Sequence, residues 1–452
     1  MEKKKQPKGL YLLGSLMMCS NFGYYGSRIV MLLFMVAGIE HGGLGLMNAQ
    51  GASILATYMA LAYLTPMLGG WLADNVLGFR KTTLIGFILC TIGYFTGFVY
   101  NSINGIYIMT GLVALGAGLY KGNLLNLLGL MYDEDEESLK DAGFSIVYSY
   151  INVGIFIGTL VCGLIATKWM ATFNTDGSVA IYGYKYVFLT TSMVLLLATV
   201  LLSTLQNSCL NGKGIKPLAA KKKNGIKEPL TEAEKKNVLV ICIVSFVASF
   251  FWIAYYQNAL SVVLYAKNHI QLTYGGFEIP LTWMDTLNAI LCVVLAGVFA
   301  KFWQWKATTK NGDFNMATKI TIGFVLLASS FALMAVSMLQ TIGGGKASIL
   351  WLIGFIVLMT MGELSFSPIA YSMVDKLAPS RLKGLMMSVF FLSVMVASKL
   401  SGYVQLFVEK MGALEAFISI VIYLLVIAGI LFSFNKKLEQ LEKEGKAKPL
   451  NI

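Results

Sequence analysis

The chain has 452 residues, of which 57% are hydrophobic and only 13% are charged, and its mean hydropathy is +0.70. Soluble proteins average about 25% charged residues, so this composition excludes an ordinary soluble protein and indicates a polytopic membrane protein. The net charge of +12 would suit a nucleic-acid partner, but most of the 35 Lys and Arg residues fall in loops on one predicted side of the membrane. That asymmetry follows the positive-inside rule, so we expect no nucleic-acid partner and both termini in the cytoplasm.

Twelve apolar windows of about 20 residues are long enough to cross a bilayer as helices. They fall near 10–38, 50–72, 82–100, 104–131, 142–170, 184–205, 237–266, 279–303, 317–339, 347–375, 385–408 and 412–434. The six cysteines are scattered through the chain, so neither a disulfide framework nor a metal site or other cofactor is predicted. No cleavable signal precedes the first span, which we expect to insert directly into the cell membrane.

The first six spans predict an N-terminal bundle over residues 1–205. Between its second and third spans the chain reads GGWLAD at 69–74 and then GFRK at 78–81. Glycines let two helices approach closely, and Asp74 with the basic pair forms a charged turn. This turn and the two six-span halves fit the plan of the major facilitator superfamily, in which substrate binds between the halves.

The fourth span, 104–131, carries Lys121 well inside its apolar run. A lysine at such a depth costs at least about 3 kcal/mol on insertion scales, so we expect it to face a polar cavity and a partner of opposite charge. The best partner by sequence is Glu363 in the tenth span. Lys121 lies 17 residues after Asn104 and Glu363 lies 16 residues after Ala347, so two parallel spans would bring the charges to nearly one depth.

The middle of the chain, 206–236, is polar and rich in lysine, and we predict a cytoplasmic linker there. Its Thr231-Glu232-Ala233-Glu234 portion has the pattern of a capped helix start, although a solvated linker is the simpler interpretation. The second bundle is predicted over 237–434, followed by a charged cytoplasmic tail at 435–452. The acidic run from Asp133 to Glu137 is expected to be a solvated loop.

Four blocks of the sequence resemble one branch of this superfamily, the proton-dependent oligopeptide transporters. The blocks are FGYYGSR at 22–28; YLTP at 63–66 through Lys81; KGN at 121–123 with DAGFS at 141–145 and YSYINVG at 148–154; and GELSFSP at 362–368 with KLAP at 376–379, KGLMM at 383–387 and FLS at 391–393. Phe251-Trp252 with Gln257, and Leu287-Asn288, also align with that family.

The resemblance implies a secondary transporter that imports di- and tripeptides together with protons and works as a monomer in the lipid bilayer. By that resemblance Arg28 and Lys121 receive the peptide carboxylate and Glu363 receives the amino terminus. The walls of the substrate site are expected to be Tyr24, Tyr25, Tyr63, Asn152, Trp252, Tyr256 and Asn288. A zwitterionic peptide presents one charge of each sign, which this set of cations and one anion can match.

The sequence departs from the family pattern at two groups that carry or relay the coupling proton. The family's Glu-x-x-Glu-Arg run in the first span is replaced by Met17-Met18-Cys19-Ser20-Asn21, and the Glu before Gln257 in the seventh span is replaced by Tyr256. Arg28 therefore loses its expected partner. The polar linker also lacks the two extra helices common in bacterial members, which favours the twelve-span form.

Two charges are new relative to the pattern, Asp285 in the eighth span and Lys399 in the eleventh. We group them with Glu363 and Lys121 as candidates for proton coupling and gating. A structural ion pair is the simpler interpretation of the new charges, and a relocated proton site or outer gate is the alternative. For the tyrosines and the tryptophan, the alternative to a role in substrate binding is packing in the core. For the asparagines, the alternative is hydrogen bonding between helices.

These residues favour a mechanism in which Lys121 pairs with Glu363 in the empty protein and a peptide replaces that pair. Three alternatives stay open at this point: a facilitator or exchanger that has lost proton coupling, a carrier of another small anion, and a membrane sensor that binds peptide without moving it. An enzyme is the weakest interpretation, because no nucleophile–base pair or metal cluster is evident and the only histidines are His41 and His269.

Overall fold

The computed structural model describes residues 5–133, 136–217, 230–309, 312–341, 343–379 and 382–435. Within these ranges eleven helical segments are long and apolar enough to cross a membrane, and α1 (Lys8–Val36) adds a twelfth long helix. The predicted all-α architecture of twelve membrane helices is therefore confirmed. The chain divides into two compact units: unit 1 comprises Met1–Asn224 with Thr273–Thr286, and unit 2 comprises Gly225–Leu272 with Leu287–Ile452.

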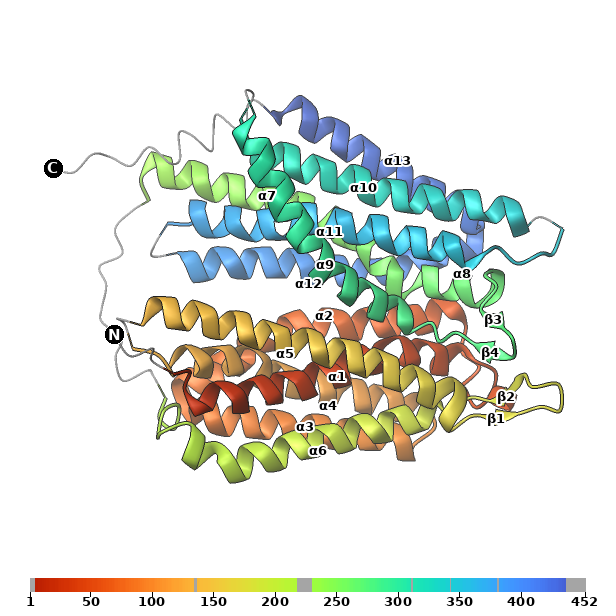
Figure 1. The fold of residues 1–452 in the computed structure, drawn as a ribbon, viewed down its shortest axis with the longest axis horizontal. Helices are drawn as coiled ribbons and strands as arrows, with labels where there is room; N and C mark the ends of the chain where they lie inside the picture. The colour runs from red at the N-terminus through yellow and green to blue at the C-terminus, as the bar shows by residue number, and fades with distance from the viewer. Residues whose placement is uncertain are drawn as a thin grey trace. The chain divides into compact units, whose positions relative to one another are not determined.

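Unit 1 is a bundle of six long helices, drawn from red to yellow-green in Figure 1. The helices are α1, α2 (Asn48–Leu72), α3 (Phe79–Val99), α4 (Ile103–Gly129), α5 (Glu137–Leu164) and α6 (Tyr184–Cys209), with the short segments η1 (Ile39–His41), η2 (Ala73–Leu77) and η3 (Ile165–Trp169). Strands β1 (Thr172–Phe173) and β2 (Val179–Ile181) form an antiparallel hairpin before α6. The helices α1, α2 and α4 carry few charges, so their apolar sequence and not capping explains most of their length.

Glycines bring α2 and α4 into backbone contact. A Cβ atom on Gly118 would lie 2.4 Å from Thr65 Cβ, and one on Gly69 would lie 2.0 Å from the carbonyl oxygen of Gly118. Thr65 uses this closeness, because its hydroxyl lies 2.8 Å from the carbonyl oxygen of Ala114 on the facing helix. The close approach expected at the paired glycines thus occurs at Gly69, whereas a Cβ on Gly70 would meet nothing within 4 Å.

The charged turn between α2 and α3 receives the chain that follows α6. Gly78 has φ +76°, and a Cβ there would lie 2.3 Å from the carbonyl oxygen of Ile215. Arg80 Nε donates to the carbonyl oxygen of Lys213 at 2.6 Å. The sequence predicts the turn but gives no signal for this partner, because the two segments are more than 130 residues apart.

Unit 2 holds the remaining long helices, drawn from green to blue in Figure 1. They are α7 (Glu232–Tyr255), η5 (Tyr256–Ala259), α8 (Ser261–His269), α9 (Trp283–Thr308), α10 (Met316–Ser337), η6 (Met338–Thr341), α11 (Ile349–Leu377), α12 (Lys383–Met411) and α13 (Ala413–Ser433). The first four residues of α9 and the hairpin of β3 (Thr273–Tyr274) and β4 (Phe277–Glu278) belong to unit 1.

The seventh span differs from the continuous helix expected over 237–266. It begins at Glu232, because Thr231 and Glu234 form a reciprocal capping box that satisfies the first backbone N–H groups. It is also broken, since the backbone at Leu260 has φ −120° and ψ −103° between η5 and α8. Thr231–Glu234 is therefore a helix start, not a solvated linker.

Parts of the sequence predictions lie outside the described residues, namely the middle of the linker at 218–229, the tail from 436 onward, and Glu134 and Asp135 in the acidic run. The predicted bundle and linker boundaries stay predictions.

The glycine contact between α2 and α4 gives a test of unit 1. Gly118→Ala should lower the thermal unfolding temperature in detergent, because overpacking of this kind costs about 1–3 kcal/mol. Gly111→Ala on the same helix is the matched control, since a Cβ there would meet nothing within 4 Å. Equal unfolding temperatures for the two variants would show that the glycine contact contributes nothing to the packing of α2 on α4.

Candidate functional site

A buried ion pair joins α1 to the first turn of α9 within unit 1. One guanidinium nitrogen of Arg28, Nη2, lies 2.7 Å from Oδ1 and 2.8 Å from Oδ2 of Asp285. The two residues are only 5% and 3% exposed. Separating such a pair would leave two uncompensated buried charges, a loss of about 3–5 kcal/mol. Asp285 is thus the partner that Arg28 lacks in the sequence pattern.

The guanidinium of Arg28 is further enclosed by aromatic and hydroxyl groups. Its Cζ atom lies 5.0 Å from the centroid of the Tyr25 ring, a cation–π contact that compensates part of the lost hydration. The Nε atom of Arg28 is buried without a hydrogen-bond partner in the part of the chain that the structure describes. Next to Asp285, Thr286 and Thr159 are linked by a 2.6 Å hydroxyl–hydroxyl hydrogen bond.

Lys121 on α4 is held differently. Its Nζ atom lies 5.6 Å from the centroid of the Tyr24 ring and 5.7 Å from that of the Tyr63 ring. Among the residues that the structure describes, no carboxylate of unit 1 forms an ion pair with it. The side chain is exposed in the structure. Two aromatic faces orient this ammonium without neutralising it, which leaves its charge available to an anion.

A cluster of tyrosines continues inward from Lys121. Tyr24 stacks on Tyr58 with ring centroids 5.5 Å apart, and the hydroxyl of Tyr58 lies 3.1 Å from that of Tyr94. The hydroxyl of Ser27 lies 2.9 Å from the same Tyr94 oxygen. The sequence analysis missed Tyr58 and Tyr94. The sequence feature that could have identified them is a tyrosine in the middle of an apolar span. A tyrosine hydroxyl buried there needs a hydrogen-bond partner, which indicates a polar cluster.

Two of the first-span residues that stand in place of the family's Glu-x-x-Glu-Arg run form hydrogen bonds within their own helix. Asn21 Nδ2 donates to the carbonyl oxygen of Met17 at 2.8 Å, and the hydroxyl of Ser20 donates to the same oxygen at 2.9 Å. These side chains therefore provide neither a negative charge for Lys121 nor a titratable group.

Glu363 on α11 is a deep charge of unit 2, and three neutral side chains are among its contacts. Its Oε2 atom accepts from the hydroxyl of Tyr255 at 2.8 Å and from Asn288 Nδ2 at 3.3 Å. The thiol of Cys292 lies 3.8 Å from the same oxygen. Asn288 is held in place by a 2.9 Å bond to the hydroxyl of Thr360. These contacts stabilise and orient the carboxylate.

Tyr255, Cys292 and Thr360 are further residues that the sequence analysis missed. The prediction selected Tyr256 from the adjacent pair of tyrosines, but it is Tyr255 whose hydroxyl reaches Glu363. The change from α7 to the 3-10 turn η5 begins at Tyr256. A regular helical period cannot reveal such a change.

The predicted aromatic wall of unit 2 is assembled around Trp252. Its ring stacks on Tyr256 at 5.6 Å between centroids and meets Tyr255 edge-on at 5.2 Å. Trp252 and Tyr256 are 6% and 4% exposed. The indole Nε1 atom of Trp252 is buried and has no hydrogen-bond partner within the described residues.

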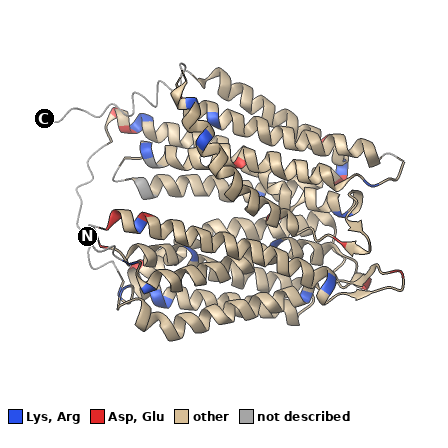
Figure 2. Cartoon of the chain, in the orientation of Figure 1, with Lys and Arg blue, Asp and Glu red and all other residues tan. Residues whose placement is uncertain are grey.

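The last two predicted site residues each contact a neighbour on their own helix. Asn152 on α5 donates to the carbonyl oxygen of Tyr148 on its own helix at 2.8 Å, so its amide is used locally. Lys399 on α12 is half-buried, and its Nζ atom lies 5.9 Å from the centroid of the Tyr403 ring. Figure 2 shows how sparse charged residues are along the middle of the helices, which makes the deep ones candidates for function.

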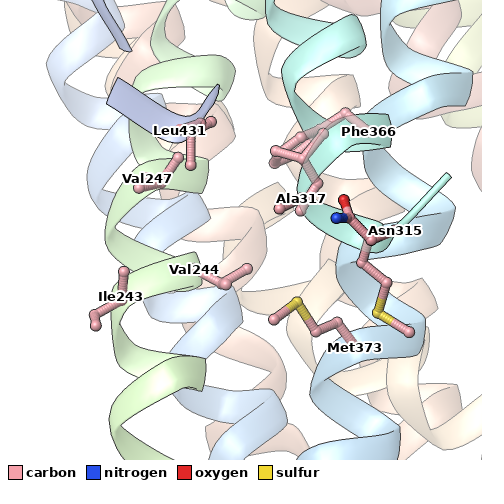
Figure 3. A pocket seen from close by; sticks show the side chains of 10 residues that line it. Ile243, Val244, Val247, Asn315, Ala317, Phe366, Met373 and Leu431 are labelled. Atoms are coloured by element: carbon pink, nitrogen blue, oxygen red, sulfur yellow. The ribbon is translucent and has the colours of Figure 1, made fainter. Parts of the chain in front are cut away.

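An apolar hollow within unit 2 is unsuited to a charged ligand. Figure 3 shows it between α7, α10, α11 and α13. Its lining consists of aliphatic, aromatic and thioether side chains with one amide, Asn315, at its edge. It contains neither Glu363 nor any other charged group among its lining residues, so the candidate site is the charged clusters and not this hollow.

Comparisons with known proteins find similar sequences and similar folds. The model of the POT family matches residues 80–208 and 205–420. The peptide transporter YePEPT of Yersinia enterocolitica is 30% identical over 443 residues, which cover 86% of each chain. The di-/tripeptide transporter of Lactococcus lactis subsp. cremoris is 28% identical over 86% of this chain and 87% of its own. The crystal structure of a POT peptide transporter in complex with sulfate is 25% identical, with a TM-score of 0.86 over 96% of both chains.

The ion pair between Arg28 and Asp285 is testable by a double-mutant cycle. Asp285→Leu and Arg28→Met should each lower the thermal stability of the protein in detergent strongly, because each leaves one buried charge unmatched, at a cost of about 3–5 kcal/mol. The double variant should be less destabilised than the sum of the two. Additive losses would contradict direct pairing.

Proposed function

Because this chain belongs to the POT family, we propose that it is a secondary active transporter that imports di- and tripeptides by alternating access. The family match spans most of the chain, and related proteins are named peptide and di-/tripeptide transporters. The site adds support of its own. Within the described residues, unit 1 presents an ammonium that lies over two tyrosine rings and pairs with no carboxylate of that unit. Unit 2 presents a carboxylate that accepts hydrogen bonds from Tyr255 and Asn288.

The contacts of these two groups, Lys121 with two tyrosine rings and Glu363 with Tyr255 and Asn288, are the observation that carries the proposal. Lys121 receives the peptide carboxylate, while Glu363 receives the peptide amino group. Both peptide termini are charged whatever the side chains are, so a site that binds the termini accepts many sequences. The tyrosines beside Lys121 and the Trp252 cluster line the variable part of the substrate without demanding one shape.

Arg28 has a different role from the one the resemblance implies. Its guanidinium is buried and paired with Asp285, so in this state it is not available to a peptide carboxylate. We assign Arg28 and Asp285 to gating and keep the carboxylate for Lys121. Asn152, whose amide bonds its own helix, and Lys399, which lies over Tyr403, support the site from further away.

Proton coupling runs through Glu363 or Asp285. The family's first-span and seventh-span carboxylates are absent from this sequence, and these two are the carboxylates that lie with the site clusters. A proton on Glu363 removes the negative charge that binds the peptide amino group. Binding and release of the peptide are then linked to protonation of the same oxygen.

The protein works in the cell membrane as a monomer, with both termini in the cytoplasm. It moves the peptide across the membrane and does not cleave or modify it. The excess of Lys and Arg in the loops predicted to share the side of the termini supports this orientation.

Glu363 gives the direct test of proton coupling. In proteoliposomes, wild-type protein should accumulate a labelled dipeptide when an inward pH gradient is imposed. Glu363→Gln keeps the shape and the hydrogen bond from Tyr255 but removes the charge, so accumulation driven by the gradient should disappear. Uptake is measured with and without the gradient over the same time course.

The matched control is Glu415→Gln, because this carboxylate is exposed in the first turn of α13 and should be dispensable. Concentrative uptake by Glu363→Gln at the wild-type level would contradict the assignment of the proton site.

A further inference from the structure

The segment Phe277–Thr286, which we call the strap, lies within Thr273–Thr286, a stretch of unit 1 that is preceded and followed in the chain by residues of unit 2. It contains β4 and the first turn of α9. In the proposed orientation it lies on the outer side of the membrane, since it follows the seventh span. The strap contacts one unit but is joined in sequence to helices of the other. If the units move during transport, the strap must either move with unit 1 or separate from it.

The strap is fixed to the end of α5 by three hydrogen bonds. Thr282 Oγ1 donates to the carbonyl oxygen of Thr159 at 2.8 Å, and Trp283 Nε1 donates to that of Leu160 at 3.4 Å. The third is the 2.6 Å hydroxyl bond between Thr286 and Thr159. Because Thr159 gives its own hydroxyl proton to the carbonyl oxygen of Ile155 at 2.8 Å, Thr286 is the donor in that bond.

A glycine makes this contact sterically feasible. A Cβ atom on Gly163 of α5 would lie 2.3 Å from Thr282 Oγ1 and 2.7 Å from Pro280 Cβ. A side chain at this position would therefore force Thr282 or Pro280 to shift.

The other end of the strap is held by contacts with η3 and with the loop before α6. The hydroxyl of Tyr182 lies 3.2 Å from both carboxylate oxygens of Glu278, and Lys168 Nζ lies 5.3 Å from the centroid of the Phe277 ring. Burial and the Glu278 carboxylate raise the pKa of Tyr182 above its ordinary value. The phenol therefore stays protonated and remains a donor to Glu278.

This docking also places Asp285 against Arg28, since Asp285 precedes Thr286 directly and both lie in the docked turn. The buried ion pair and the α5 contacts thus form and break together. Release of the strap requires another partner for Arg28 or loss of charge on Asp285, because two unmatched buried charges are too costly.

We propose that the strap is the outer gate of the transporter and that Thr159 is the positioning residue that seats Asp285 against Arg28. This inference rests on the proposed function and deepens it. When the strap is docked the outer side is closed, and when it leaves α5 the outer side opens to peptide.

A reversible crosslink tests the gate. The pair Thr159→Cys and Thr286→Cys replaces two hydroxyl oxygens that are 2.6 Å apart, close enough for a disulfide. The background carries Cys162→Ala, since Cys162 lies one turn from Thr159. Oxidation should reduce dipeptide uptake about tenfold or more, and a reductant should restore it. The single-cysteine variants should show no response to the oxidant.

Equal uptake by the double-cysteine protein in its oxidised and reduced states would contradict the proposal that the strap is the outer gate. Absence of uptake even in the reduced protein and the wild type would overturn the proposed function instead. In that case strap docking is still measurable, as the rate at which an impermeant maleimide added outside labels Thr282→Cys.

The labelling assay also tests Thr159 as a positioning residue. Thr282 is only 2% exposed, so labelling should be slow while the strap is docked. Thr159→Val removes the hydroxyl and should raise the labelling rate severalfold, and Thr159→Ser should restore the slow rate. A rate that is the same in all three proteins would overturn this role.

Discussion

The buried ion pair between Arg28 and Asp285 is the constraint on which the rest of the site depends. A charge sunk this deeply is tolerated only with a partner or a wet cavity, and here both members are enclosed within unit 1. Because the two charges neutralise each other, Arg28 is not available to bind a substrate anion in this state. In the proposed function, Lys121 is therefore the described cation of unit 1 that meets the substrate.

This arrangement explains how the chain tolerates its departures from the family pattern. The seventh-span position before Gln257 holds Tyr256 and carries no charge, yet Arg28 is still paired, because the strap brings Asp285 to it from the following span. The first-span carboxylates have no such replacement: Ser20 and Asn21 bond their own helix. Lys121 is consequently left between two tyrosine rings, which hold its ammonium without cancelling its charge.

Much of this architecture follows from the sequence. Long apolar runs specify membrane helices, and deep charges such as Lys121, Glu363 and Asp285 are visible as exceptions within those runs. Pairing is harder to predict, because Arg28 and Asp285 are 257 residues apart and their contact depends on how the loop after α8 folds back on α5. The choice of Tyr255 over Tyr256 depends on a local change from α-helix to 3-10 turn, and the early start of α7 depends on a capping box whose sequence also suits a solvated linker.

The most direct measurement is the effect of amidating the peptide carboxylate on competition for uptake, in wild type and in Lys121→Gln. If Lys121 alone receives the carboxylate, amidation should weaken competition in wild type by about tenfold or more, as expected for loss of a charge-assisted contact. The same change should have little effect in Lys121→Gln. An amidation penalty that is equally large in Lys121→Gln would show that another cation receives the carboxylate and would contradict the account.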